Sequence, residues 1–183
     1  NPYHICKNDK VSLLTSMSGG ALTSIAYTLL NGATLYLYDV QRSGVSELEN
    51  WLRCEHVSIW LMASPLFRTM AANVKAGNHF NDLRLIRLMS DNVFNSDIEL
   101  CKKILPPNGV IVNGLATTET FWISVNLLDQ DTEMPGEEVP IGYPVEDKEV
   151  FLVDDNGKQV GFNEVGEIVV KSRYLSLGYW QNT

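Results

Sequence analysis

The chain has 183 residues, of which 45% are hydrophobic and 20% are charged. This balance is typical of a folded globular domain and excludes disordered, collagen-like and coiled-coil chains. Apolar runs such as Ser58 to Ala63 are too short to span a bilayer. The first residues, Asn1 to His4, lack the basic and then apolar pattern of a signal peptide. We therefore expect a cytoplasmic protein with no membrane partner.

The net charge of −8 comes from one part of the sequence. Residues 1–125 carry ten basic and ten acidic side chains, whereas residues 126–183 carry four and twelve. Proteins that bind nucleic acids normally present an excess of Lys and Arg, because they neutralise phosphates. No nucleic-acid partner is therefore expected.

The cysteines, Cys6, Cys54 and Cys101, show no CxxC spacing. Their odd number and wide separation predict neither a disulfide framework nor a zinc site. The histidines are scattered as well, without a cysteine or carboxylate at metal-ligand spacing. We interpret the cysteines as reduced, mostly buried thiols, as expected in the cytoplasm.

In the first two thirds of the chain, short β-rich runs alternate with helical patterns, which is typical of a parallel sheet covered by helices. The expected strands are Val11 to Thr15, Ala33 to Val40, Val57 to Met62, Leu83 to Met89 and Gly109 to Asn113. The expected helices are Ala21 to Leu30, Val45 to Glu55, Pro65 to Lys75 and Ser96 to Leu105.

Two of these helices have start signals. Ser64 precedes Pro65, which is the pattern of a capping residue followed by proline in the first turn. Ser96 is followed three residues later by Glu99, which predicts a capping box.

A polar, acidic and proline-bearing stretch over residues 129–140 indicates a loop. Beyond it, Glu149 to Val153 and Glu167 to Lys171 predict strands, with an Asn-Gly turn in Asp154 to Gly157. These strands form a second, smaller β unit.

The predicted fold class is α/β. A parallel sheet with flanking helices is expected over residues 1–128. A small, acidic, β-rich part of the same core is expected over residues 129–183.

One stretch, Val112 to Thr120, carries the residue types of a ligand site. A buried strand is followed at once by hydroxyl residues and one carboxylate, at the carboxyl end of a parallel sheet, where open α/β folds bind ligands. Thr117 and Thr118 could donate to phosphate oxygens, and Glu119 could hold a magnesium ion that bridges phosphates. The residue types alone favour a simpler interpretation, a turn whose threonines bond to their own backbone.

This stretch also resembles the motif (Tyr/Phe)-Gly-(Pro/Ser)-Thr-Glu, and further motifs flank it in matching order and spacing. Together they resemble the AMP-forming adenylating enzymes, a superfamily of nonribosomal peptide synthetase adenylation domains, acyl-CoA synthetases and luciferases. The resemblance covers essentially the whole chain and is greatest for the peptide synthetases. The matching stretches are Leu29 to Leu35, Leu83 to Asp91, Asn113 to Glu119, Val139 to Pro144, Val153 to Asp155, Val165 to Ile168 and Leu177 to Trp180.

The resemblance implies an ATP-dependent ligase that uses Mg²⁺. Such an enzyme activates a carboxylic acid as acyl-AMP and transfers the acyl group to the phosphopantetheine thiol of a carrier protein. An acyl-CoA ligase, with CoA as acceptor, or a fatty-acyl-AMP ligase is the alternative within the class. A non-catalytic nucleotide-binding or interaction module is the alternative of another class.

Three landmarks of this superfamily are not in the sequence. Its glycine-rich phosphate loop would precede Asn1, and its ribose-binding Asp and the C-terminal subdomain with the catalytic Lys would follow Thr183. We therefore expect a partial domain, the central fragment of the N-terminal subdomain. The isolated fragment is expected to be inactive, because phosphate binding and charge neutralisation are what such sites supply.

The resemblance also assigns roles in nucleotide binding. Thr118 would contact phosphate and Glu119 would bind magnesium, and both are expected catalytic residues. The residues expected around the adenine are Asn113, Gly114 and Leu115, through their backbone, and the loop residues Ser90 and Asp91. Leu115 stands where the superfamily usually has an aromatic ring and Ala116 replaces a glycine, so weaker nucleotide stacking is expected.

The acyl pocket is the second site that the resemblance implies. Its expected lining is Gly19, Gly20, Thr23, Leu61, Arg87, Met89, Gly114, Trp122 and Ile123. Gly19 stands where amino-acid-activating members have an Asp that binds the α-ammonium group. We therefore expect an acid without an α-amino group, such as a keto, hydroxy, aryl or fatty acid. An amino acid held by some other group is the alternative.

Three of these residues also have simpler interpretations. Trp122 and Met89 are equally expected as core side chains. Arg87 lies in an expected strand, where a charge needs a partner. The favoured partner is Asp91, and the alternative is a carboxylate or carbonyl of the substrate.

Overall fold

The computed structural model describes residues 3–14, 19–72, 74, 79–89, 91–134 and 136–181. The chain forms two compact units that interleave along the sequence. The first unit contains Asn1–Asn113 and Leu127–Pro140, and the second contains Gly114–Asn126 and Ile141–Thr183. The division expected after residue 128 stays a prediction. In the described part of the chain, no helix is both long enough and apolar enough to cross a bilayer.

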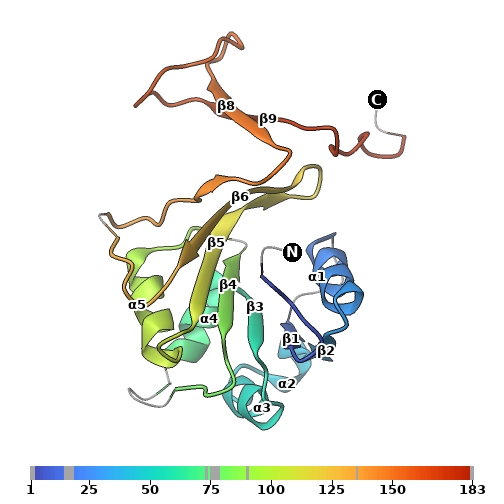
Figure 1. The fold of residues 1–183 in the computed structure, drawn as a ribbon, viewed down its shortest axis with the longest axis vertical. Helices are drawn as coiled ribbons and strands as arrows, with labels where there is room; N and C mark the ends of the chain where they lie inside the picture. Colours follow the sequence, from blue (N-terminus) through green and yellow to red (C-terminus); the bar gives the residue numbers. More distant parts are fainter. Residues whose placement is uncertain are drawn as a thin grey trace. The chain divides into compact units, whose positions relative to one another are not determined.

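The first unit is built on a parallel sheet (Figure 1). Its strands are β1 (Lys10–Leu13), β2 (Thr34–Leu37), β3 (Ile59–Ala63), β4 (Leu85–Met89) and the first residues of β5 (Val110–Thr117). They follow the order β2-β1-β3-β4-β5, and each neighbouring pair is parallel. The register places Arg87 between Leu61 and Val112. The predicted parallel α/β sheet is confirmed.

Helices connect and cover these strands. They are α1 (Gly19–Leu30), α2 (Val40–Ser43), α3 (Leu48–Cys54), α4 (Ser64–Ala71) and α5 (Asn95–Ile104). Figure 1 shows α4 next to α5, and α1 beside β1 and β2, in agreement with the residue contacts between these elements. The expected helix over residues 65–75 ends earlier, at Ala71, and Lys75 lies outside the described residues.

The core lies between one face of this sheet and α3, α4 and α5. Alternate strand positions point to this face, so they are apolar and buried. The core side chains include Trp60, Met62, Ile86, Leu88 and Ile111 from the strands and Leu52, Phe67, Ile98 and Cys101 from the helices. All three cysteines are free thiols, but Cys6 and Cys54 are exposed, so the expectation of mostly buried thiols is wrong. Cys101 is buried, and burial raises the pKa of its thiol.

The cap predicted at Ser64 is wrong. Ala63 precedes the helix, and Ser64 is already its first residue. The buried Ser64 hydroxyl donates to the carbonyl of Met89 over 3.4 Å. The Ser64 hydroxyl, which the local pattern predicted to cap the helix, therefore bonds to β4 instead. Pro65 does lie in the first turn, as expected.

The capping box predicted for Ser96 and Glu99 is also wrong. Helix α5 begins at Asn95, and the carboxylate of Asp97 accepts the N–H of Phe94 at 2.9 Å. Two bonds of 2.8 Å from Arg68 in α4 hold the same carboxylate. This contact between distant segments selects the helix start, and a local pattern does not contain it.

A short helix replaces the end of the strand expected over residues 33–40. Strand β2 ends at Leu37. The Asp39 carboxylate then accepts the backbone N–H groups of Gln41 and Arg42, at 3.0 and 3.1 Å, and so caps α2. Asp is a favoured capping residue because it satisfies N–H groups that have no partner inside the helix.

The second unit is a β structure. It contains the end of β5, most of β6 (Phe121–Leu128) and β7 (Tyr143–Pro144), and the separate antiparallel pair β8 (Glu149–Val153) and β9 (Glu167–Lys171). The bounds of β8 and β9 are those expected. The predicted turn is confirmed, because Gly157 has a φ of 76° and its N–H donates to the carbonyl of Asp154 at 2.9 Å. Strand β6 was not expected.

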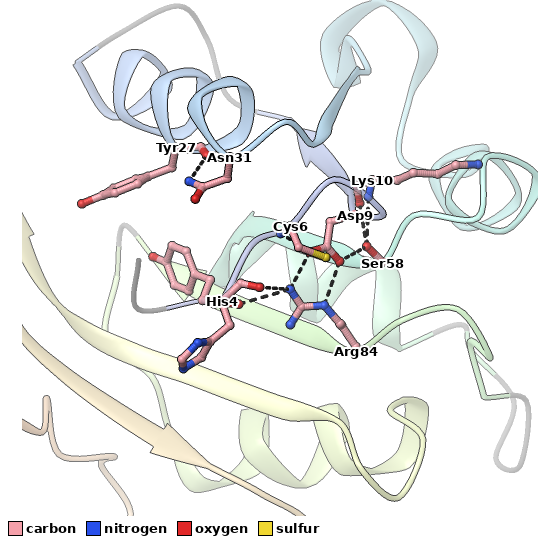
Figure 2. Close-up of polar contacts among 9 residues, drawn as sticks. His4, Cys6, Asp9, Lys10, Tyr27, Asn31, Ser58 and Arg84 are labelled. Atoms are coloured by element: carbon pink, nitrogen blue, oxygen red, sulfur yellow. Dashed lines mark hydrogen bonds and ion pairs between the residues drawn. The ribbon is translucent and has the colours of Figure 1, made fainter.

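A buried carboxylate, that of Asp9, joins the N-terminal ends of neighbouring strands in the first unit (Figure 2). Its two oxygens accept bonds of 2.7 Å from Nε and a terminal nitrogen of Arg84, just before β4. The hydroxyl of Ser58, just before β3, and the backbone N–H of Cys6 donate at 2.9 Å. Burial disfavours the charge, but these donors outweigh it and lower the pKa of Asp9 to about 2.

We predict that Asp9→Asn lowers the free energy of unfolding by about 2 kcal/mol at neutral pH, because the substitution leaves Arg84 without its charge partner. The pKa of Asp9 is lower in the folded state than in the unfolded state. The contribution of the carboxylate is therefore complete above the unfolded pKa of about 4 and is lost as the pH falls towards 2. Denaturant unfolding at neutral pH and at acid pH measures both effects.

The matched control is Asp82→Asn. Asp82 bonds to His56 at 2.8 Å, but both side chains are more than half exposed. We expect this control to change the free energy of unfolding by less than about 0.5 kcal/mol. An equal effect of the two substitutions, or an Asp9 effect that persists unchanged at acid pH, would contradict the interpretation.

Candidate functional site

The stretch that carries the predicted phosphate and magnesium residues is a turn in the second unit. Strand β5 continues through Thr117, and β6 begins at Phe121, so Thr118 and Glu119 lie in the turn between them. Both side chains are exposed. The sequence predicted that the strand ends at residue 113, whereas β5 extends four residues further, to Thr117. The turn therefore begins at Thr118.

Thr117 stabilises this turn through its hydroxyl group. Its Oγ1 accepts the backbone N–H of Thr120 at 3.2 Å and lies 2.9 Å from the Thr120 hydroxyl. The interpretation in which a threonine bonds to the local backbone therefore applies to Thr117. Thr118 keeps the exposed position that a phosphate contact would require.

Glu119 is held by the segment that follows β9. The Tyr179 hydroxyl donates to Oε1 of Glu119 at 2.5 Å, and the N–H of Ser176 donates to its backbone carbonyl at 2.8 Å. The ammonium group of Lys148 donates to the carbonyl of Thr120 at 2.6 Å. The bond from Tyr179 lowers the pKa of Glu119, and the same bond raises the pKa of Tyr179. Glu119 is therefore an exposed, ionised carboxylate at neutral pH.

Gly114 allows the close approach of β6. A Cβ atom at this position would lie 2.3 Å from the carbonyl oxygen of Ser124 and 2.8 Å from the ring of Trp122. Only glycine fits here, because the nearest atom belongs to the backbone. Trp122 and Ile123 are buried, which agrees with a core role in this unit. Leu115 is half-buried, and Ala116 is exposed.

Asn113, by contrast, belongs to the first unit. Its side-chain amide is buried and donates to the carbonyls of Val139 and Pro140 at 3.2 and 3.1 Å. The Asn113 side chain therefore holds the start of the motif Val139 to Pro144 in place. Whether the Asn113 backbone borders adenine stays a prediction.

Asp91, on the expected adenine-side loop, pairs with Arg68. A terminal nitrogen of Arg68 lies 3.5 Å from Oδ2 of Asp91 and another donates to the carbonyl of Asn92 at 2.8 Å. Ser90 lies outside the described residues. Arg68 is thus a positioning residue of this loop that the sequence did not reveal, since its partners are more than 20 residues away.

Arg87 lies on the face of β4 opposite the core. Its guanidinium group lies 5.7 Å from the ring centroid of Tyr3, and burial is the main cause that lowers its pKa. Tyr3 contacts Tyr27 of α1, with ring centroids 6.4 Å apart. Buried Leu61 is the neighbour of Arg87 in the sheet register, and half-buried Met89 follows on the same face of β4.

The other predicted pocket residues divide between the units. Gly19 and Gly20 begin α1, and Thr23 lies one turn later. Gly20 is exposed, and no atom lies within 4 Å of the position that a Cβ would take. The first unit thus contains the residues from α1, β3 and β4, and the second unit contains Gly114, Trp122 and Ile123.

The chain is similar to known proteins in sequence and in fold. Residues 9–180 match the family described as AMP-binding enzyme. Tyrocidine synthase 3 of Brevibacillus parabrevis is 28% identical over an alignment of 183 positions, which covers 98% of this chain and 3% of that protein. The chain therefore spans a small part of this relative.

Two solved structures show the same fold. CmiS6 has a TM-score of 0.85 and 24% identity, and the comparison covers 98% of this chain and 44% of that chain. O-succinylbenzoate Coenzyme A Synthetase (MenE) from Bacillus subtilis, in complex with ATP and magnesium ion, has a TM-score of 0.79 and 19% identity. That comparison covers 99% of this chain and 36% of the MenE chain.

We predict that Gly114→Ala destabilises the second unit by about 1–3 kcal/mol, because the added methyl group forces β6 away from β5. Gly136→Ala is the control, since among the described residues no atom beyond its chain neighbours lies within 4 Å of the added Cβ. Thermal unfolding of both variants measures the difference. An equal loss of stability in the two variants would show that the close approach at Gly114 is not required.

Proposed function

Because the chain belongs to the family of AMP-binding enzymes, we propose that the protein containing it activates a carboxylic acid with ATP as an acyl-adenylate. The carboxylate oxygen attacks the α-phosphorus of ATP, an acyl-phosphate bond forms, and pyrophosphate leaves. The observation that carries the proposal is the exposed turn with Thr118 and Glu119, in a chain that matches the family over residues 9–180.

Glu119 fits the role of magnesium ligand. Mg²⁺ normally takes one or two carboxylates and completes its octahedron with phosphate oxygens and water. In the described part of the chain, no group of three or more His, Cys, Asp or Glu side chains could hold a metal ion. A single exposed carboxylate such as Glu119 is therefore suited to a cation that arrives with a nucleotide. Bound Mg²⁺ would neutralise charge on the phosphates.

The adenosine and phosphate contacts follow the same assignment. Thr118 donates its hydroxyl to phosphate, and the backbone at Asn113, Gly114 and Leu115 borders the adenine. Ser90 and Asp91 are the further residues that we assign to the adenine. The structure of MenE with ATP and magnesium ion supports ATP and Mg²⁺ as the cofactors, because its fold is shared by this chain.

For the acid, we propose a substrate without an α-amino group. Helix α1 begins at Gly19 and carries no acidic residue in its first turn. An α-ammonium group would therefore meet no carboxylate at the position where amino-acid-activating relatives are expected to have one. Buried Arg87 and Leu61 and half-buried Met89 supply a cationic and apolar environment on the sheet, which suits a carbonyl, hydroxyl or aryl group better than an ammonium group.

The acceptor that we propose is the phosphopantetheine thiol of a carrier protein. The similarity to tyrocidine synthase 3 over nearly the whole chain supports this choice. Transfer to CoA is the alternative, and the shared fold with a Coenzyme A synthetase favours it. In both cases the thiol sulfur attacks the acyl carbon and AMP leaves.

The proposal is tested by ATP–pyrophosphate exchange with the complete protein that contains this chain. We expect exchange with one class among keto, hydroxy, aryl and fatty acids, and a loss of about 100-fold or more in Glu119→Gln, because the cation loses its protein ligand. Exchange with α-amino acids alone would overturn the proposed substrate class. A folded protein that exchanges with no acid would support a non-catalytic module instead.

We also predict that Leu115→Tyr raises the affinity for ATP by about 3- to 10-fold, because an aromatic ring adds stacking on the adenine. Calorimetric titration of the complete protein with ATP measures this change. Leu127→Tyr, at a 56% exposed leucine of β6, is the control and should leave ATP affinity unchanged. An unchanged affinity in Leu115→Tyr would place the adenine elsewhere.

A further inference from the structure

The segment Ser176 to Tyr179 returns to a residue about sixty positions earlier in the sequence, Glu119. It makes two bonds to that residue, at different atoms. One reaches the backbone carbonyl, from the N–H of Ser176, and the other reaches Oε1, from the hydroxyl of Tyr179. The segment is itself ordered by the N–H of Gly178, which donates to the Ser176 hydroxyl at 3.2 Å.

These two bonds do different work. The bond from Ser176 fixes the backbone of the turn, together with the bond from Lys148 to the Thr120 carbonyl. The bond from Tyr179 acts on the side chain alone. An exposed Glu side chain otherwise samples many rotamers, and a ligand that needs one of them must bear the entropic cost of ordering it.

The Tyr179 bond leaves the carboxylate able to bind a cation. A carboxylate has about four acceptor positions on its two oxygens, and one donated hydroxyl occupies one of them. The donor is neutral, so it adds no positive charge that would repel a cation. It therefore orients the carboxylate without neutralising it, as partners outside the metal's own ligands do for other ligating carboxylates.

We infer that Tyr179 is a positioning residue that holds the Glu119 carboxylate in the orientation that takes Mg²⁺ with ATP. This inference rests on the proposed function, because it assumes that Glu119 is the magnesium ligand. It adds a residue of the C-terminal segment to the site, and it makes the ordering of residues 176–179 a condition for tight binding of the Mg²⁺–ATP complex.

The test uses Tyr179→Phe in the complete protein. Calorimetric titration with ATP at a series of Mg²⁺ concentrations should show a half-saturating Mg²⁺ concentration raised by about 3- to 10-fold, while ATP binding without Mg²⁺ is unchanged. The pyrophosphate exchange rate at saturating Mg²⁺ should stay within about 2-fold of the parent rate. A general loss of structure would instead reduce ATP binding with and without the metal.

Tyr143→Phe is the matched control, because Tyr143 is an 83% exposed tyrosine of β7 in the same unit. It should leave the Mg²⁺ requirement unchanged. Tyr179→His keeps a ring with a hydrogen-bond donor and should restore part of the lost Mg²⁺ affinity. Tyr179→Phe combined with Glu119→Gln should show no Mg²⁺ effect beyond that of Glu119→Gln alone.

The outcomes separate the two proposals. If Glu119→Gln leaves the Mg²⁺ requirement unchanged, Glu119 is not the ligand and the proposed assignment fails. If Glu119→Gln raises the requirement and Tyr179→Phe does not, the positioning role of Tyr179 alone is overturned. A lower Mg²⁺ requirement in Tyr179→Phe would overturn it as well, because the bond would then hold the carboxylate away from the cation.

Discussion

The ion pair between Asp9 and Arg84 aligns the N-terminal ends of the strands in the parallel sheet. Parallel strands that are separated by helices have no tight turn to fix their register, so another contact must do so. Asp9, Ser58 and Arg84 each stand just before a strand, and one buried carboxylate joins all three. Backbone bonds continue the same line, from the N–H of Ser58 to Lys10 and from that of Arg84 to Ser58. With the starts fixed, the carboxyl ends of the strands, and the loops that follow them, also take fixed positions.

At the other end of the same strands, Arg68 has a comparable role. It leaves α4 and binds the Asp97 carboxylate at the start of α5, the Asn92 carbonyl and Asp91. Hydrogen bonds to Asp97 are the main cause that raises the pKa of Arg68, so the guanidinium stays charged. Ion pairs at both ends of these strands thus hold the loops, while the apolar core between the sheet and α3, α4 and α5 holds the layers together. Burial supplies most of the stability, and the ion pairs supply register.

The sequence predicted what depends on local pattern and missed what depends on distant partners. The parallel sheet, four helices and the β8–β9 pair follow from periodicity and turn residues, and the structure contains them. The predicted capping box of Ser96 and Glu99 is wrong because Asp97 forms the cap instead, and its carboxylate is held by Arg68, which lies 29 residues earlier. Strand β6 was missed because its sequence follows a motif that was interpreted as a loop. The motif did identify Glu119 as a candidate, but nothing in it indicates that Tyr179 contacts this residue. A motif names residues, whereas their pairing is a property of the fold.

The exposure of the Thr118–Glu119 turn is itself informative about how such a site operates. A structural metal site gathers several protein ligands and is complete in the protein alone. Here the described residues offer no such cluster, and Glu119 is exposed. Under the proposed function, a cation held by this carboxylate would share its coordination with phosphate oxygens and water, and metal and nucleotide would bind together. Preorganisation of Glu119 would then matter more than in a closed site, because the described residues form no cluster of metal ligands that could compensate for a misplaced carboxylate. Under the proposed function, the bonds that order Glu119 and its turn would act on the Mg²⁺ concentration that the site needs, whereas the carboxylate itself would act on the chemical step.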